Sequence, residues 1–178
     1  MKILVIGLGA IGLLITHIAL ALGYKVLVTE PVKSKLKLAA SMGAIPVGVD
    51  LHQHKVADQL QGICEEEKIK SVFECAGSET SASLAIKIAP RGAEVVLLGL
   101  SDRPASFHPM ELAKKGIRIN PSLIYDHPSD YKRTIYLIRK GIIQPGFIVT
   151  RFFSLNEARK ALKEASKGTE SKIVIRMQ

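Results

Sequence analysis

Three glycines near the amino terminus constrain the fold of this chain more than any other feature. Gly7, Gly9 and Gly12 follow the apolar run from Ile3 to Ile6 at G-x-G-x-x-G spacing. A short β-branched run of this kind is typical of a strand that is buried on both faces. The apolar stretch from Ile11 to Leu22 then has the length of a helix. The pattern predicts a strand, a tight glycine turn and a buried helix.

The same stretch has an alternative interpretation as a secretory signal or a membrane span. Lys2 is followed by no charged residue until Lys25 when His17 is neutral. A second apolar run, 25–29, then ends at Glu30, a continuation that a signal peptide has no reason to supply. We therefore favour the strand, turn and helix.

The spacing of the glycines also indicates what such a turn can bind. The first glycine permits the tight turn, the second lets the backbone approach a pyrophosphate, and the third lets the helix pack closely on the strand. Unpaired N–H groups at the helix start, together with the helix dipole, favour phosphate oxygens. The residues expected to bind a dinucleotide through backbone and shape are Gly7, Gly9, Ala10, Ile11 and Gly12.

An acidic residue follows at the position where such folds bind a ribose. Glu30 comes eighteen residues after Gly12, at the end of the second apolar run. A carboxylate there accepts hydrogen bonds from ribose hydroxyls and repels a 2′-phosphate, which favours NAD(H) over NADP(H). Lys33 and Lys35 are close enough in sequence to tolerate part of the extra phosphate charge. The alternative for Glu30 is an exposed acid at a strand end.

Composition limits the class of protein. The chain has 178 residues, 47% of them hydrophobic, enough for one domain with a real core. Its two cysteines cannot make a four-ligand zinc cluster and fit a reducing, cytoplasmic location. The pair His52 and His54 has no third ligand nearby in sequence, so we expect solvated loop histidines.

The net charge of +9 raises the question of a nucleic-acid partner. The basic residues are dispersed along helix-like segments without interleaved aromatics, which favours solvated helix faces. A field that attracts a small anionic ligand is the alternative. We expect neither a nucleic-acid nor a membrane partner.

Further apolar runs alternate with helix-like segments. Strands are expected at 44–47, 71–75 and 94–98, helices at 34–42, 56–63 and 81–89, and a solvated acidic turn at 65–67. The alternation predicts an α/β fold, a Rossmann-type doubly wound parallel sheet with helices on both faces. Small residues that follow a strand, as Ala76 and Gly77 do, mark where a ligand can lie. For Cys75 we favour an apolar wall residue over a nucleophile, since no His or Asn partner is local.

The organisation changes after Gly99. We expect helices at 109–115 and 131–140 and a strand at 117–125, which Pro121 places at a sheet edge. A strand at 147–153, a capping box at 154–157 that opens a helix up to residue 167, and a strand at 172–176 complete the chain. The predicted division is a dinucleotide-binding domain at 1–128 and a return segment at 129–178 packed on it, or both as one domain.

Taken in order, these motifs resemble the medium-chain dehydrogenase/reductase superfamily, the zinc-type alcohol dehydrogenases. The resemblance is carried by the glycine turn, Glu30, the runs 37–44, 73–77, 95–99 and 141–145, and the terminal stretch 168–175. It covers essentially the whole chain and matches the family's cofactor-binding domain with its C-terminal segment.

The resemblance implies a set of cofactor contacts. Lys35 matches the family's basic residue just beyond the acid, and Lys172 matches a position that can reach the pyrophosphate. Pro121 replaces the glycine often found before Ser122, a departure that weakens the match there. The remaining implied contacts are Cys75, Ala76 and Gly77 on the adenosine side and Leu98, Gly99, Leu100, Ser122 and Ile124 on the nicotinamide side.

The resemblance also implies a dimer formed by edge strands near 101–107 or 117, and a catalytic zinc domain ahead of the glycine turn. We assign no catalytic residue or zinc ligand here; His108 and His127 are expected to be loop histidines.

Two functions follow from these expectations. The first is the NAD(H)-binding domain of an alcohol or polyol dehydrogenase-like oxidoreductase, which positions nicotinamide for hydride transfer while a separate catalytic domain or subunit supplies substrate chemistry. The alternative is a non-catalytic dinucleotide-sensing or interaction module. In either case we expect a homo-oligomer, with exposed apolar residues among Phe147, Ile148, Phe152 and Phe153.

Overall fold

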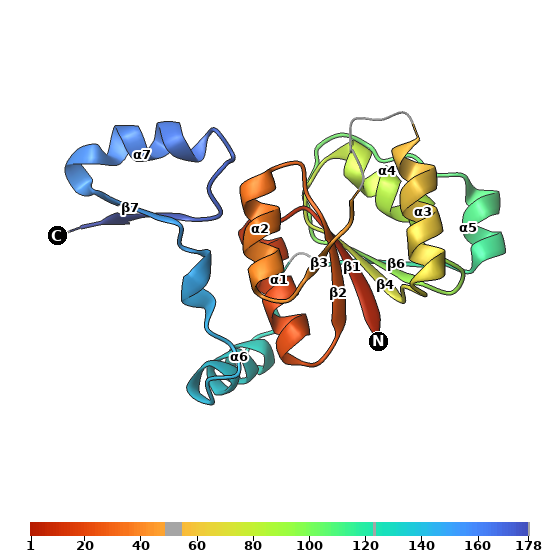
Figure 1. The fold of residues 1–178 in the computed structure, drawn as a ribbon, viewed down its shortest axis with the longest axis horizontal. Helices are drawn as coiled ribbons and strands as arrows, with labels where there is room; N and C mark the ends of the chain where they lie inside the picture. Colours follow the sequence, from red (N-terminus) through yellow and green to blue (C-terminus); the bar gives the residue numbers. More distant parts are fainter. Residues whose placement is uncertain (49–54, 123, 178) are drawn as a thin grey trace.

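The computed structural model describes residues 1–48, 55–122 and 124–177 and contains one main parallel sheet (Figure 1). Its six strands lie in the order β3-β2-β1-β4-β5-β6, and every pair of neighbours is parallel. This is the doubly wound order, so the predicted Rossmann-type α/β fold is confirmed. The strands are β1 (Lys2–Ile6), β2 (Lys25–Thr29), β3 (Ile45–Pro46), β4 (Ser71–Glu74), β5 (Glu94–Leu97) and β6 (Arg118–Pro121).

Helices cover both faces of this sheet because each central strand is apolar on both sides. In β1, Ile3 and Val5 belong to one core, while Leu4 and Ile6 belong to the other. Helices α1 (Ala10–Ala21) and α2 (Lys33–Ser41) pack on the first core (Figure 1). Helices α3 (Val56–Glu66), α4 (Glu79–Ile88) and α5 (Pro109–Lys115) pack on the second.

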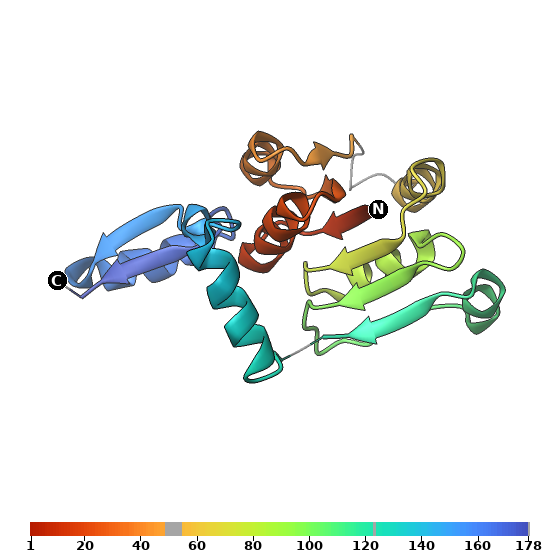
Figure 2. The same cartoon turned by 90° about the horizontal axis from the view of Figure 1, so that it is seen from below.

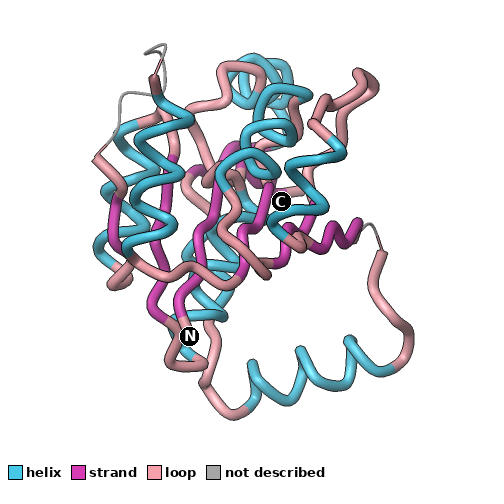
Figure 3. The backbone as a smooth tube through the Cα atoms, turned by 90° about the vertical axis from the view of Figure 1, so that its right-hand side faces the viewer, coloured by secondary structure: helices cyan, strands magenta, loops and turns pink. Residues whose placement is uncertain are grey.

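The C-terminal part forms a small separate unit beside the main sheet (Figure 2). Strands β7 and β8 pair in parallel as a two-stranded sheet. In the view of Figure 3, α6 lies below the main body and is joined to it by loops, and none of its residues is buried. The elements are α6 (Ser129–Arg139), the 3₁₀ helix η1 (Pro145–Ile148), β7 (Arg151–Ser154), the 3₁₀ helix η2 (Leu155–Glu157), α7 (Ala158–Ala165) and β8 (Ile173–Arg176).

The unit contacts the main body at η1. Phe147 and Ile148 pack against the core under α1 and α2. The His17 ring on α1 lies 4.8 Å from the Phe147 ring, and its Nε2 atom accepts a hydrogen bond from Gln144 N at 3.1 Å. These contacts attach the C-terminal unit to α1.

Several predicted elements differ from the structure. The predicted strand at 147–153 is wrong in its first half, because Pro145 and Gly146 begin a 3₁₀ helix there. The acidic turn expected at 65–67 begins only at Glu67, since α3 continues through Glu66. Helix α4 begins two residues earlier than expected because Ser78 caps it, and β6 ends at Pro121 instead of 125. The Ser154 to Glu157 capping box and the edge position of Pro121 are confirmed.

The expectation that apolar residues of this unit are exposed holds only in part. Phe152 is 51% exposed, with the Arg176 guanidinium 4.3 Å from its ring centre. Phe153 is buried, at 5% exposure, and Phe147 and Ile148 are half-buried. Phe152 is thus the exposed member of the four, and the prediction does not hold for the buried Phe153.

Candidate cofactor site

The glycine turn joins β1 to α1 at the carboxyl edge of the sheet. Gly7 has a φ of +88°, and its N–H donates to Thr29 O at 2.9 Å. A Cβ on Gly12 would overlap with the carbonyl oxygen of Gly7, so the helix starts in direct contact with the turn. A Cβ on Gly9, by contrast, would meet no atom within 4 Å. Gly7 and Gly12 therefore permit the tight turn and the close packing, while Gly9 lies against open space.

The start of α1 is left open in the same place. Gly9 is the N-cap residue in an extended conformation, and no described side chain caps the helix. Ala10 and Ile11 form the first turn, and Ile11 is 54% exposed. The geometry leaves N–H groups and the positive end of the helix dipole facing the open side of Gly9.

Glu30 lies beside this turn, as predicted, and has a second use that sequence reasoning missed. Its Oε2 atom accepts a hydrogen bond from Leu8 N at 2.7 Å, and its Oε1 atom accepts one from Val32 N at 3.1 Å. The carboxylate thus fixes the glycine turn and is itself held at the end of β2. The strand-end position of Glu30 was visible in the sequence, whereas the bond back to Leu8 was not.

A cavity of about 560 Å³ opens between the glycine turn and the loop after β4. It lies where the strand order reverses, between β1 and β4, which is where ligands bind in open α/β sheets. The cavity brings together six of the predicted residues: Gly7, Gly9, Glu30, Lys35, Cys75 and Ala76. It is also lined by residues that were not predicted: Ile6, Thr29, Pro31, Val56, Ser78, Thr80, Ser81 and Leu84.

Serines at the start of α4 give the cavity polar groups that sequence reasoning did not assign. Ser78 and Ser81 form a reciprocal capping box, in which Ser81 N donates to Ser78 Oγ at 3.1 Å. The Ser-x-x-Ser spacing was the available signal, but such a box pairs a Ser or Thr with Glu or Gln more often than with Ser.

The thiol of Cys75 lies in the cavity wall. Burial, and to a smaller extent the charge of Glu74, raises the pKa of this thiol to about 12. A thiol with such a pKa is protonated at neutral pH and is a poor nucleophile. The structure thus agrees with the prediction of an apolar wall residue.

The predicted nicotinamide-side residues follow β5 and β6 at the same edge of the sheet. A Cβ on Gly77 would lie 3.2 Å from Leu100 O, so the turns after β4 and β5 are in contact. Leu100 is 70% exposed, and Ser122 N donates to Leu97 O at 2.9 Å. Leu98, Gly99, Leu100 and Ser122 therefore border the carboxyl edge but do not line the 560 Å³ cavity.

Other predicted positions lie elsewhere. Lys172 is exposed beside β8 in the C-terminal unit and is not among the residues that line the cavity. Ile124 is 81% exposed. His52 and His54 lie outside the described residues.

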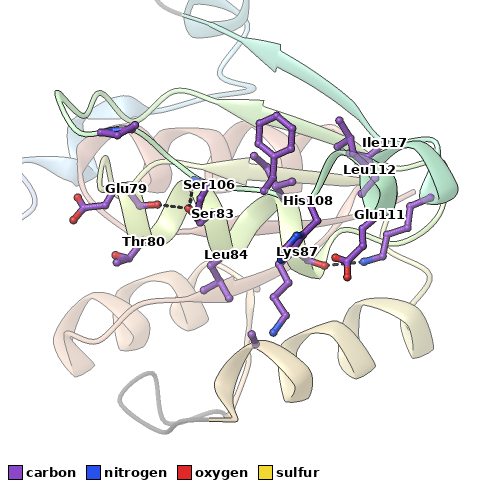
Figure 4. A pocket seen from close by; sticks show the side chains of 15 residues that line it. Glu79, Thr80, Ser83, Leu84, Lys87, Ser106, His108, Glu111, Leu112 and Ile117 are labelled. Carbon is purple, nitrogen blue, oxygen red and sulfur yellow. Dashed lines mark hydrogen bonds between the residues drawn. The ribbon is translucent and has the colours of Figure 1, made fainter.

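A second cavity, of about 730 Å³, lies over the outer side of α4 (Figure 4). The segment 104–108 closes one side of it, held by a hydrogen bond from Ser106 N to Ser83 Oγ at 2.9 Å. Lys115 Nζ donates to Lys87 O at 2.8 Å on the other side. Thr80 and Leu84 line both cavities. None of the predicted cofactor contacts lies in this second cavity.

Residues 1–48, 55–122 and 124–177 form neither a cluster of metal ligands nor a membrane-spanning helix. Within them, no three His, Cys, Asp or Glu side chains come together as a metal site would require. No helix in those ranges has the length and apolarity needed to cross a bilayer.

With this geometry established, comparisons with known proteins identify the family. Residues 10–140 match the family model described as zinc-binding dehydrogenase. The chain is 29% identical to D-xylulose reductase from Morganella morganii over 165 residues, which are 92% of this chain and 48% of that protein. It also resembles sorbitol dehydrogenase from Mus musculus, at 26% identity over 98% of this chain and 49% of that protein.

A solved structure supports the same assignment. Alcohol dehydrogenase from Thermus sp. ATN1 superposes with a TM-score of 0.86 at 26% identity, over 97% of this chain and 50% of that one. The chain spans about half the length of the curated relatives it matches.

Proposed function

Since the chain belongs to the zinc-binding dehydrogenase family and has the fold of its alcohol dehydrogenase-like cofactor-binding domain, we propose that it binds NAD(H) and positions nicotinamide for hydride transfer. When bound, nicotinamide supplies the hydride chemistry. The substrate class we propose is an alcohol or polyol, in line with the relatives' names.

The open side of Gly9 is the observation that carries this proposal. Of the three glycines in the turn, only Gly9 has free space where a side chain would be, and it lies at the uncapped start of α1. A pyrophosphate fits such a cradle, because backbone N–H groups can approach its oxygens without a side chain between them.

Each side of the cavity has a proposed role. Glu30 accepts hydrogen bonds from the adenosine ribose through lone pairs that Leu8 N and Val32 N leave free. Cys75, Ala76 and Gly77 lie along the adenosine, and Leu98, Gly99, Leu100 and Ser122 border the nicotinamide half. Lys35, which follows Glu30 in the chain, also lines the cavity. Lys172 would reach the pyrophosphate only if the C-terminal unit moved toward the cavity.

The test compares two Gly→Ala variants by titration calorimetry with NADH. Gly9→Ala places a methyl group in the proposed pyrophosphate cradle, so we expect the Kd for NADH to rise by about tenfold or more. Gly62→Ala in α3 is the matched control, since a Cβ there also meets no atom within 4 Å but lies far from the glycine turn. Absence of NADH binding by the folded, unmodified chain at millimolar concentration would overturn the proposal.

We also propose NAD(H) over NADP(H), because the fixed carboxylate of Glu30 repels a 2′-phosphate. Glu30→Gln removes the charge and keeps one of the two acceptor bonds, to Leu8 N or to Val32 N, because its amide has a single oxygen. It should narrow the difference between the Kd values of NADH and NADPH. Equal binding of the two cofactors by the unmodified chain would contradict this specificity.

The activity of a whole dehydrogenase requires a catalytic region, on this polypeptide or another. We propose that such a region, with its zinc, joins this chain and that the assembly is a homo-oligomer. Alcohol oxidation that is restored by mixing with a zinc-loaded catalytic domain would support the proposed catalytic region. Light scattering measures the oligomeric state. A cofactor-binding chain that restores no activity in such mixtures would favour the non-catalytic sensing module.

A further inference from the structure

Glu74 is a buried carboxylate that the proposed cofactor contacts do not use. It is the last residue of β4, in the middle of the sheet, and only 1% of it is exposed. Within the described ranges it makes no ion pair. A buried acid without a cation is costly, so its contacts require an explanation.

One oxygen of Glu74 holds the turn after its own strand. Oε1 accepts hydrogen bonds from Ala76 N at 2.8 Å and from Gly77 N at 2.9 Å. These two residues form the turn that lines the adenosine side of the cavity. The side chain therefore determines the course of this turn.

The other oxygen lies against the turn after β5. Oε2 is buried and has no hydrogen-bond partner among the described residues. A Cβ on Gly99 would overlap both with this oxygen and with Gly77 N. The main-chain oxygen of Glu74 accepts further hydrogen bonds from Leu98 N at 2.9 Å and Gly99 N at 3.0 Å.

The turn after β4 also contacts the glycine turn. A Cβ on Gly7 would lie 2.8 Å from Ala76 N and 2.9 Å from Ala76 Cα. A continuous set of contacts thus runs from Gly7 through Ala76 to Glu74 and on to Gly99. It connects the pyrophosphate cradle with the nicotinamide side.

From these contacts we propose that Glu74 is a positioning residue that sets the distance between the adenosine-side turn, 76–77, and the nicotinamide-side turn, 99–100, through the shape of its carboxylate. This inference rests on the proposed NAD(H) function. The spacing of the two turns does not require a negative charge on residue 74, because an amide oxygen also accepts hydrogen bonds from Ala76 N and Gly77 N. A shorter side chain cannot make both contacts.

The test separates shape from charge with two substitutions, Glu74→Gln and Glu74→Asp. Calorimetry measures binding of NADH, which spans both turns, and of AMP, which occupies only the adenosine side. Glu74→Gln should change both Kd values by no more than about threefold, because it retains the acceptor and the length. Glu74→Asp should raise the Kd of NADH by about tenfold or more and that of AMP by no more than about threefold. An Asp carboxylate still accepts from the N–H groups of Ala76 and Gly77, as in an Asx turn, but is too short to keep the contact with Gly99.

Glu94→Gln is the control, at the opposite end of the neighbouring strand β5, and should bind both ligands normally. If Glu74→Asp does not fold, Glu74→Asn, which has the same reduced length without a buried charge, should show the same split between NADH and AMP.

The inference is overturned if Glu74→Asp binds NADH normally, if Glu74→Gln is the weaker binder, or if AMP binding falls in parallel with NADH binding. An unmodified chain that binds neither ligand would overturn the proposed function too, which distinguishes the two failures.

Discussion

A Cβ atom on residue 12 would overlap with the carbonyl oxygen of Gly7, so α1 starts this close to β1 only because that side chain is absent. Gly12→Ala should therefore destabilise the fold by about 1–3 kcal/mol, as overpacking of a tight contact does. Urea unfolding measures the difference. Gly62→Ala in α3 should instead stabilise by about 0.5–1 kcal/mol, because alanine is the better helix residue in open space. Equal effects of the two substitutions would contradict this role of Gly12.

The two cysteines predict how stability changes at high pH. Burial raises the pKa of both Cys64 and Cys75 from the ordinary 9.0 to about 12. Below pH 9 the thiols are protonated in the folded and the unfolded chain, and they do not affect the pH dependence. Between pH 9 and 12 only the unfolded chain releases these protons, so stability falls as pH rises, by up to about 1.4 kcal/mol per pH unit for each thiol.

Urea midpoints at pH 8 and pH 10.5 measure this fall. The variant with Cys64→Ala and Cys75→Ala should lose less stability over that interval than the unmodified chain. The same burial predicts slow reaction of both thiols with a disulfide reagent at pH 8 until urea unfolds the protein. A rapid reaction of the folded chain would contradict the assignment of Cys75 as a wall residue.

At the scale of elements, one acid links three of them at the amino end of the sheet. Glu67, just after α3, accepts hydrogen bonds from Lys2 Nζ at 2.8 Å and Lys25 Nζ at 2.9 Å, at the starts of β1 and β2. The bond from Lys2, then that from Lys25, lowers the pKa of Glu67.

Because its folded pKa is lowered, this stabilisation is present above the ordinary pKa of a carboxyl group and is lost as pH falls through the lowered value. Glu67→Gln should have a lower Tm than the unmodified chain at pH 7, and the difference should shrink as the pH falls below the ordinary pKa of a carboxyl group. The exposed ion pair of Lys87 and Asp58 is the control, and removal of its Asp58 charge should change the Tm by less. A difference that persists unchanged in acid would show that the loss is not electrostatic.

Among the elements, those with local sequence signals could be predicted, and contacts between distant turns could not. The unit β1–turn–α1 was predictable because its signals are local: a β-branched run, glycines at fixed spacing and a helix-length apolar segment. The contacts of Glu74 were not, since they join turns after two different strands and depend on the side-chain path. In sequence, Glu74 is simply an acid inside an apolar run.

The local sequence pattern gave a wrong prediction at 147–148, where a strand and a 3₁₀ helix are both compatible with the residues. Phe147 and Ile148 are β-formers, yet Pro145 lacks an N–H and has a fixed φ suited to a helical turn. The 3₁₀ helix that results directs both side chains toward the core under α1 and α2. Pro145 and the packing of both side chains on this core together favour the helical turn, and only the first of these signals is local in the sequence.

At the scale of the whole molecule, stability is uneven. The two cores enclose β1 and β4, whereas α6 has no buried residue and exposes Tyr131, Ile135, Tyr136 and Ile138. Helices without a packed face rarely persist alone, because helix nucleation is unfavourable. Amide exchange should therefore be fast throughout α6 and slow in β1 and β4, in a chain free of any partner.

His17 on α1 helps to attach the C-terminal unit to the main body. His17→Ala removes both the acceptor for Gln144 N and the ring that contacts Phe147. Exchange of the amides of residues 143, 144 and 146–148 should then speed up by about tenfold or more, since a lost hydrogen bond and ring contact together are worth over about 1 kcal/mol. The exchange in β1 and β4 should stay the same, because their cores do not depend on this contact.

His108→Ala, at an exposed histidine before α5, is the control. Faster amide exchange across the entire sheet in His17→Ala would mean that the unit and the main body unfold together, as one cooperative domain and not as two.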